Sequence, residues 1–203
     1  MSKIALDVVL LPPHDVAAQA IAISNTLAET SGNRKIVLDG EAYLPHISLC
    51  MGAVDETDLP RVKAILSEVA GRLPALRLTM SGIKAHAIPT GEQLAVLEVD
   101  NGPELQGLHE TIMQKLQPYL SYNDVDARMF VSPPPAEPIS VKWVRDFDPS
   151  NNSPMAFYPH LTSGFGTYDD FAFPITFTAD TLAMCHLGNY CTCRKVLASF
   201  TLQ

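Results

Sequence analysis

Hydrophobic residues follow two different periods near the start of the chain, and together they predict a mixed α and β fold. Residues 4–11 are apolar almost without a break, and Asp7 is the one charged side chain among them. A short, continuous apolar run of this kind is typical of a strand that is buried on both faces. Over residues 14–30 apolar residues instead recur every three or four positions, which predicts a helix that ends near Gly32.

The same two patterns continue through the rest of the chain. They predict strands over residues 35–38, 44–53, 76–80, 83–88, 93–100, 157–165, 177–187 and 191–202, and helices over residues 57–71 and 101–118. Because the order strand, helix, strand occurs twice, we expect a single α+β domain made of two related halves, residues 1–90 and 91–203.

The second half is longer because of a segment at about residues 121–156, which is rich in Pro, Asp and Asn. Loops of this length are uncommon unless they have a function or are mobile. Two interpretations stay open at this point. The segment is either a lid over a binding site or an insertion that the surface tolerates.

A four-residue pattern of proline, histidine, an apolar residue and a hydroxyl residue occurs twice. The two copies are Pro45-His46-Ile47-Ser48 and Pro159-His160-Leu161-Thr162. Both lie in sequence predicted as strand, where side chains at positions i and i+2 point to the same face. His46 is therefore expected to share a face with Ser48. In the same way, His160 is expected to share a face with Thr162.

The two copies together offer the groups that phosphodiester chemistry needs. Histidine titrates near pH 6.5, so at neutral pH one imidazole can act as a base while another acts as an acid. Hydroxyl groups can donate hydrogen bonds to phosphate oxygens, where negative charge builds up in the transition state. We therefore predict that His46 and His160 are catalytic. Ser48 and Thr162 are predicted to bind phosphate.

An aromatic residue precedes each motif histidine. Tyr43 lies three positions before His46, and Tyr158 lies two positions before His160. Either ring could stack on a nucleobase of a substrate, whereas aromatic side chains at strand ends more often pack in a core. Both roles stay open for the two tyrosines.

A third pairing of histidine with a hydroxyl residue, His109 and Thr111, lies in the helix predicted over residues 101–118. On a helix, positions i and i+2 are roughly 200° apart, so these two side chains cannot act together. We predict that they form a surface pair with no role in a site.

The overall composition narrows the class of protein. The chain has 203 residues, a net charge of −8 at pH 7 and a pI near 5.1. This acidic balance argues against a long nucleic-acid groove, since such grooves carry basic stripes. No stretch reaches the length of a membrane span, and the first residues lack a cleavage-site pattern. We therefore expect a cytoplasmic protein with no membrane partner.

The four cysteines do not amount to a disulfide framework in a chain of this length. Three of them, Cys185, Cys191 and Cys193, lie close together in sequence beside His186, but their spacing fits no common zinc site. We expect reduced thiols and no bound metal.

The repeated motif resembles that of the two-histidine (2H) phosphoesterase superfamily, which contains RNA 2′,3′-cyclic phosphodiesterases and 2′,5′-RNA-ligase-like proteins. The family has a pair of His-x-Thr/Ser motifs between apolar residues, and residues 44–49 and 158–162 fit that pattern. Residues 182–202 resemble the closing hairpin of the family. Two features depart from it: residues 163–166 lack the Arg that some relatives carry after the second motif, and the chain has no evident basic tract for RNA.

The resemblance implies both a fold and an activity. The implied fold is two pseudo-symmetric lobes, each a mostly antiparallel sheet with helices on its outer side, with an active-site cleft between them. The implied activity is hydrolysis of a 2′,3′-cyclic phosphate on a small nucleotide or RNA end to a 2′-phosphate, with no cofactor. The resemblance favours His46 as the acid and His160 as the base.

Other activities stay open. They are a 2′,5′-linkage phosphodiesterase or ligase, an ADP-ribose cyclic phosphate hydrolase, and a module that binds nucleotides or RNA ends with little turnover.

Overall fold

The protein is described by a computed structural model over residues 2–150 and 157–203, and within these ranges it forms eight strands and four α-helices. The strands are β1 (Lys3–Leu11), β2 (Ile47–Asp55), β3 (Leu76–Ala87), β4 (Gln93–Val99), β5 (His160–Phe165), β6 (Ile175–Ala179), β7 (Thr181–Leu187) and β8 (Cys193–Thr201). The helices are α1 (His14–Ser31), α2 (Leu59–Ala70), α3 (Pro103–Leu116) and α4 (Pro138–Asp146). The end of α1 follows the prediction, because Gly32 takes the left-handed conformation that closes a helix (φ 69°).

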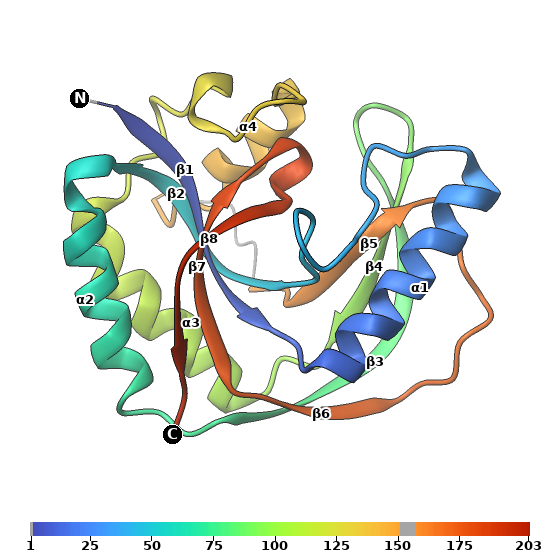
Figure 1. The fold of residues 1–203 in the computed structure, drawn as a ribbon, viewed down its shortest axis with the longest axis horizontal. Coiled ribbons are helices and arrows are strands. Elements are labelled where there is room, and N and C mark those ends of the chain that lie inside the picture. The colour runs from blue at the N-terminus through green and yellow to red at the C-terminus, as the bar shows by residue number, and fades with distance from the viewer. Residues whose placement is uncertain (1, 151–156) are drawn as a thin grey trace.

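The described strands form two four-stranded antiparallel sheets, with strand orders β2-β1-β7-β8 and β5-β4-β3-β6. Each sheet takes strands from both parts of the chain. Strand β3 joins the sheet of β4 and β5, whereas the C-terminal hairpin β7-β8 joins the sheet of β1 and β2. The predicted α+β fold with two mostly antiparallel sheets is therefore confirmed (Figure 1).

Three of the helices cover the two sheets. Helix α1 packs against β5, whereas α2 and α3 pack against each other and against the sheet that contains β2 and β8. Figure 1 shows α2 and α3 side by side on one side of the molecule and α1 on the opposite side. The helices thus lie outside the sheets, as the family resemblance implies.

Strand β1 is buried on both faces, which explains its continuous apolar sequence. One set of alternate residues packs in the main core with α2 and α3: Ile4, Leu6, Val8 and Leu10. Ala5, Asp7 and Val9 alternate with that set and lie on the other face of the sheet, where they are also fully buried. Asp7 is thus an ionisable side chain that is buried on the face of the sheet opposite the main core.

The two motif strands share one irregularity of pairing. Where β2 pairs with β1, the register shifts after Ser48, so Leu49 has no partner of its own. Where β5 pairs with β4, it shifts after Thr162 and leaves Ser163 unpaired. A β-bulge re-aims the side chains beside it. The two motif strands therefore match in the detailed register of their pairing.

Three segments differ from the sequence-based prediction. Residues 35–38 form no strand, and the backbone N–H of Leu38 donates instead to the hydroxyl of Ser24 in α1. The strands predicted over 76–80 and 83–88 form the single strand β3, because a register shift near Gly82 continues the pairing where a break was expected.

The strand predicted over residues 177–187 is in fact two strands that belong to different sheets. Strand β6 ends at Ala179, β7 starts at Thr181, and Asp180 lies between them. The chain passes from one sheet to the other at this point. Apolar pattern alone cannot show such a crossing, because both strands are buried.

The expectation that all four cysteines are reduced is wrong for two of them. Cys185 in β7 and Cys193 in β8 form a disulfide, with their Cα atoms 5.7 Å apart, within the usual range for this bond. Cys50 and Cys191 are buried free thiols. The antiparallel hairpin places Cys185 and Cys193 on neighbouring strands, and their separation of eight residues does not show this without the turn geometry.

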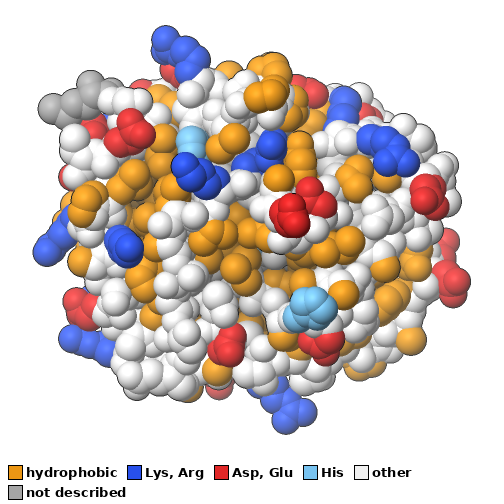
Figure 2. All heavy atoms as spheres, in the orientation of Figure 1, with side chains coloured by type: hydrophobic (Ala, Val, Ile, Leu, Met, Phe, Trp, Pro, Cys, Tyr) orange, Lys and Arg blue, Asp and Glu red, His pale blue; other side chains and the backbone are white. Residues whose placement is uncertain are grey.

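Two further observations concern the outside of the molecule. No helix in residues 2–150 or 157–203 is long and apolar enough to cross a membrane. Figure 2 draws the face of the molecule that Figure 1 shows. On that face Lys and Arg side chains lie at several separate places among acidic and apolar ones, and they form no continuous basic stripe.

Candidate active site

A pocket of about 450 Å³ is lined by residues of both sheets. Side chains from β2, β4 and β5 form part of its wall, and α3 and α4 contribute others. Within residues 2–150 and 157–203, apolar and aromatic side chains dominate the lining, and no Lys or Arg belongs to it. The structure brings the two copies of the motif to this one place, since the following residues all line it: His46, Ser48, His160 and Thr162.

The first motif histidine is held by the backbone just before it. His46 immediately precedes β2, and its Nδ1 lies 2.7 Å from the carbonyl oxygen of Leu44. Leu44 is itself fixed, because its N–H donates to the carbonyl of Cys193 in β8 (3.1 Å). A carbonyl oxygen can only accept, so Nδ1 of His46 carries a proton and Nε2 remains as the reactive nitrogen.

The second motif histidine repeats this arrangement. His160 begins β5, and its Nδ1 lies 2.8 Å from the carbonyl oxygen of Tyr158, again two residues earlier. The same reasoning leaves Nε2 of His160 free to take up or release a proton. Both imidazoles are thus fixed in the same tautomer by local backbone geometry.

Burial determines how both imidazoles titrate. His46 is 9% exposed, and burial lowers its pKa below the usual value near 6.5. The bond to Leu44 acts against this, the charge of nearby His160 lowers the pKa of His46 further, and a backbone hydrogen bond at Cys191 raises it. Burial also lowers the pKa of His160, and the charge of His86 adds to that effect. Both imidazoles are therefore mainly neutral at pH 7 in the free protein.

The two motif hydroxyls have different surroundings. The hydroxyl of Ser48 donates to Oδ2 of Asp7 at 2.6 Å. The hydroxyl of Thr162 has no hydrogen-bond partner within residues 2–150 and 157–203. Thr162 is therefore free to donate to a ligand, whereas the proton of Ser48 is engaged as long as Asp7 accepts it.

Of the two tyrosines considered for stacking, the structure brings one to the pocket. Tyr158 lines it beside His160, with ring centroids 5.2 Å apart, and its hydroxyl donates to Glu98 at 2.9 Å. Tyr43 is not part of the lining, and its ring lies 4.3 Å from the guanidinium of Arg194. A stacking role remains a hypothesis for Tyr158 alone.

A third histidine belongs to the pocket, although the sequence predicted it at the surface. His109 in α3 lines the pocket, its Nδ1 lies 2.7 Å from the carbonyl oxygen of Leu49, and its ring stacks on Phe157 with centroids 4.0 Å apart. The prediction of a surface pair is wrong for His109, because α3 packs against β2 and turns this side chain inward. Thr111 does not line the pocket, so the two residues do not act together.

Other residues complete the wall. His86 at the end of β3 and Trp143 of α4 both line the pocket, so part of the segment over residues 121–150 contributes to it. Although several histidines lie around this pocket, no group of three or more His, Cys, Asp or Glu within the described ranges is placed to hold a metal ion. Whether the segment acts as a lid stays a prediction, and residues 151–156 lie outside the described residues.

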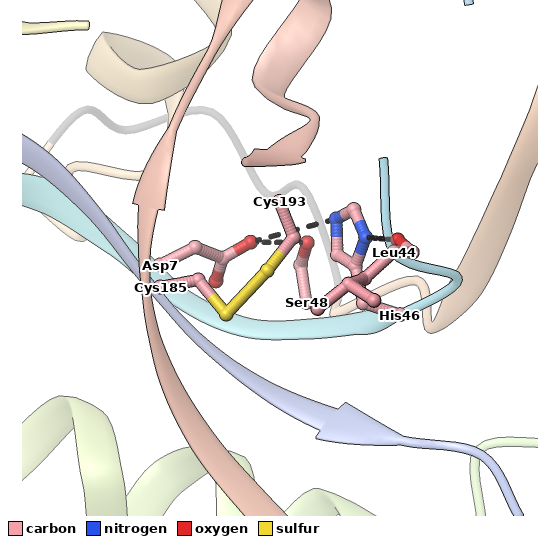
Figure 3. The surroundings of a disulfide bond; sticks show 6 residues. All are labelled: Asp7, Leu44, His46, Ser48, Cys185 and Cys193. Atoms are coloured by element: carbon pink, nitrogen blue, oxygen red, sulfur yellow. Dashed lines mark hydrogen bonds and ion pairs between the residues drawn. A yellow bond between two sulfur atoms is a disulfide. The ribbon is translucent and has the colours of Figure 1, made fainter. Parts of the chain in front are cut away.

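Asp7 is the residue of this site that the sequence reasoning did not select. It is fully buried, it contacts Ser48, and its Oδ2 lies 4.0 Å from Nε2 of His46 (Figure 3). The sequence did contain a signal for Asp7. A single acidic residue within an otherwise apolar strand is expected to be buried, and a buried acid needs a polar partner.

Comparisons with known proteins agree with this geometry. A family model described as the 2′-5′ RNA ligase superfamily matches residues 39–187. Among solved structures, TT0787 of Thermus thermophilus is 14% identical, with a TM-score of 0.58 over 98% of each chain. LigT of E. coli in its apo form is 12% identical, with a TM-score of 0.60 over 100% of this chain and 99% of LigT.

A third structure, described as a phosphoesterase, is 12% identical, with a TM-score of 0.51 over 98% of both chains. At such low identities these structures show the shared fold. No curated protein sequence matches. The family model spans more than two thirds of the chain and includes both motifs. The chain therefore belongs to the 2′-5′ RNA ligase superfamily, the two-histidine phosphoesterases that its repeated motif resembles.

Proposed function

We propose that this protein hydrolyses a 2′,3′-cyclic phosphate, on a small nucleotide or an RNA end, to a 2′-phosphate by acid–base catalysis with paired histidines. One observation carries the proposal. Two imidazoles, one just before β2 and one at the start of β5, line one pocket, and a backbone carbonyl two residues earlier bonds to Nδ1 of each, so that Nε2 is the nitrogen that can exchange a proton. A module that only binds its ligand would not need both an acid and a base.

The proposed reaction uses the two histidines in opposite roles. Nε2 of His160 takes a proton from water while the water oxygen bonds to phosphorus. The bond from phosphorus to O3′ breaks, and Nε2–H of His46 gives its proton to that oxygen. The products are a 2′-phosphate and a 3′-hydroxyl, and the histidines then exchange their proton with solvent. General acid and base catalysis of this kind typically contributes about 10²- to 10⁴-fold each.

The remaining groups of the site would bind the substrate. Hydroxyls of Ser48 and Thr162 would donate to the non-bridging oxygens, whose charge increases in the transition state. Tyr158 offers an exposed aromatic face beside His160 on which a base could stack. Tyr43 has no part in this scheme.

Relatives of the same fold support a nucleotide ligand. Structures of E. coli LigT have been determined with 3′-AMP, ATP, NADP⁺ and phosphate. The pocket of the present chain combines apolar and aromatic walls with a few polar groups, which suits a nucleoside attached to one phosphate.

The test is turnover of 2′,3′-cyclic AMP in the presence of EDTA, with separation of the 2′- and 3′-phosphate products. Wild-type protein should form the 2′-phosphate. His46→Ala and His160→Ala should each lower kcat/KM by about 10²- to 10⁴-fold while retaining the wild-type circular dichroism spectrum. His14→Ala, at the exposed start of α1, is the matched control and should retain full activity.

Two outcomes would contradict the proposal. One is a 3′-phosphate product, and the other is retention of activity when either motif histidine is replaced. If the cyclic mononucleotide is not turned over at all, the family description favours a second candidate, cleavage or joining of a 2′,5′-linked dinucleotide. The same variants and the same control then apply to that substrate.

A further inference from the structure

Asp7 lies behind the first motif and away from solvent. It projects from the centre of β1 on the face opposite the main core, and it is 0% exposed. The cross-strand neighbour of Asp7 on β7 is Cys185, whose disulfide with Cys193 lies beside it (Figure 3). The free thiols of Cys50 and Cys191 are buried as well.

The polar neighbours of Asp7 are few, namely Ser48, His46 and the backbone N–H of Cys50. Its Oδ2 forms a 2.6 Å hydrogen bond with Oγ of Ser48, whereas Nε2 of His46 is 4.0 Å away, beyond hydrogen-bond distance. Its Oδ1 is buried and has no partner within the described residues. A buried carboxylate with one unsatisfied oxygen is costly, and a neutral carboxyl group avoids most of that cost.

The surroundings of Asp7 favour the neutral form. Burial raises its pKa well above the usual value, although the hydrogen bonds from Ser48 and from the backbone N–H of Cys50 act in the opposite direction. Burial raises the pKa values of the Cys50 and Cys191 thiols, so these neighbouring thiols stay uncharged.

The protonation state of Asp7 decides what Ser48 can do. A serine hydroxyl has one proton to donate. If Asp7 is ionised, it takes that proton, and Ser48 then presents only lone pairs to a phosphate anion. If Asp7 is neutral, it donates its own proton to Oγ, and the hydroxyl proton of Ser48 is free to point into the pocket.

Resting on the function proposed above, we infer that Asp7 is a positioning residue that acts as a neutral carboxylic acid, donating from Oδ2 to Ser48 so that Ser48 donates to a phosphate oxygen of the substrate. The first motif is thus supported from behind by a hydrogen-bond donor.

The second motif has no such support. In each half, one residue of the neighbouring strand faces the motif hydroxyl: Val9 faces Ser48 and Val96 faces Thr162. Two positions before that residue, the first half has Asp7 and the second half has Leu94. Support of the motif hydroxyl by a carboxyl group therefore belongs to the first motif only and does not follow from the repetition of the motif.

The test compares two substitutions of Asp7 that differ in hydrogen bonding and not in charge. The amide of Asp7→Asn can still donate to Ser48, so its kcat/KM for 2′,3′-cyclic AMP should stay within about threefold of wild type. Asp7→Ala cannot donate and should lose about 10- to 100-fold, as should Ser48→Ala. The double variant with Asp7→Ala and Ser48→Ala should be no worse than Ser48→Ala alone, because Asp7 acts through Ser48.

Two results would overturn the inference. Asp7→Asn as impaired as Asp7→Ala would show that the negative charge of the carboxylate is required. A further loss in the double variant beyond that of Ser48→Ala would show that Asp7 acts by another route. If Asp7→Ala does not fold, as judged by circular dichroism, the comparison of Asp7→Asn with Ser48→Ala still decides the point.

A second measurement needs no turnover and so separates this inference from the proposed function. Infrared spectra at pH 7 should contain the carbonyl stretch of one protonated carboxyl group that is absent in Asp7→Asn. Binding of inorganic phosphate should be weakened by Ser48→Ala and retained by Asp7→Asn. An ionised Asp7 at pH 7 would refute the inference, even if the enzyme hydrolyses the cyclic phosphate as proposed.

Discussion

Two local features set the proton chemistry of His46 and His160, the backbone carbonyl that fixes Nδ1 and the burial that favours the neutral ring. The first feature leaves Nε2 as the nitrogen that can exchange a proton in both. The second makes both imidazoles better suited to accept a proton than to donate one in the free protein. A bound phosphate anion would reverse this preference for one ring by stabilising its protonated form.

These lowered pKa values predict an acidic optimum for kcat/KM, which reports the free enzyme. The acid must be protonated and the base must not, so activity is highest between the two pKa values, and both lie below 6.5. We expect the optimum of kcat/KM for 2′,3′-cyclic AMP below about pH 6.5, with a decline at higher pH as the acid loses its proton. The pH profile of kcat/KM checks this. A maximum at or above pH 7 would contradict it, and His14→Ala should leave the profile unchanged.

Among the elements, the two motif strands resemble each other in detail. Each has a bulge directly after the hydroxyl residue of its motif. In β5 the residue after the bulge is Gly164, which has a φ of 143° and lies close to α1. A Cβ there would meet the carbonyl oxygen of Ile36 at 3.4 Å and Leu27 at 3.6 Å. The bulge that presents His160 and Thr162 thus depends on a glycine.

We expect Gly164→Ala to lower the free energy of unfolding by about 1–3 kcal/mol, because the backbone conformation is strained for any residue with a Cβ. Gly107→Ala is the matched control, since Gly107 lies within α3 with nothing within 4 Å of the added Cβ. That substitution should raise the free energy of unfolding by about 0.5–1 kcal/mol. Urea denaturation measures both, and equal stability of Gly164→Ala and wild type would refute the prediction.

At the scale of the whole molecule, the two sheets hold both motifs around one pocket whose described lining lacks Lys and Arg. The same lining includes Asp146 and Asp148. Attraction for an anionic substrate must therefore come from protonated histidine and from hydrogen-bond donors. Such a site suits the single negative charge of a cyclic phosphodiester better than a group with several charges.

This charge distribution predicts a preference among substrates. Adding a 5′-phosphate to 2′,3′-cyclic AMP should lower kcat/KM by about fivefold or more, since two charges near 4 Å interact by about 1 kcal/mol even in water. Asp148→Asn should reduce that difference, whereas Asp15→Asn in the exposed first turn of α1 should not. Steady-state kinetics on the two substrates decide it, and a higher kcat/KM for the more charged substrate would count against the prediction.

The C-terminal hairpin makes the other prediction at this scale. Unfolded without reductant, the protein should show two titratable thiols per chain, Cys50 and Cys191, and four after reduction. Because the disulfide closes a short loop, reduction should lower the free energy of unfolding by about 2–3 kcal/mol. Thiol titration in denaturant is the measurement. Four thiols before reduction would show that Cys185 and Cys193 are not bonded.

Most elements of this fold, and the pair of motifs, could be predicted from the amino-acid sequence. The hydrophobic period and the residues that start or end an element are local properties of the sequence. For that reason β1, α1, α2 and α3 could be predicted within a few residues. The motif could be recognised for the same reason, because four adjacent residues in a strand have a fixed spatial relation. The family and the two-sheet fold followed from that motif, and both are confirmed.

The residues that surround the motifs depend on how the strands and helices pack in three dimensions. His109 lies in the pocket because α3 packs on β2, and Asp7 lies behind Ser48 because β1 pairs with β2. The crossing between sheets at Asp180 and the bond between Cys185 and Cys193 depend likewise on strand pairing. Such contacts join residues far apart in the chain or separated by a turn, and hydrophobic period carries no information about which strand becomes the neighbour.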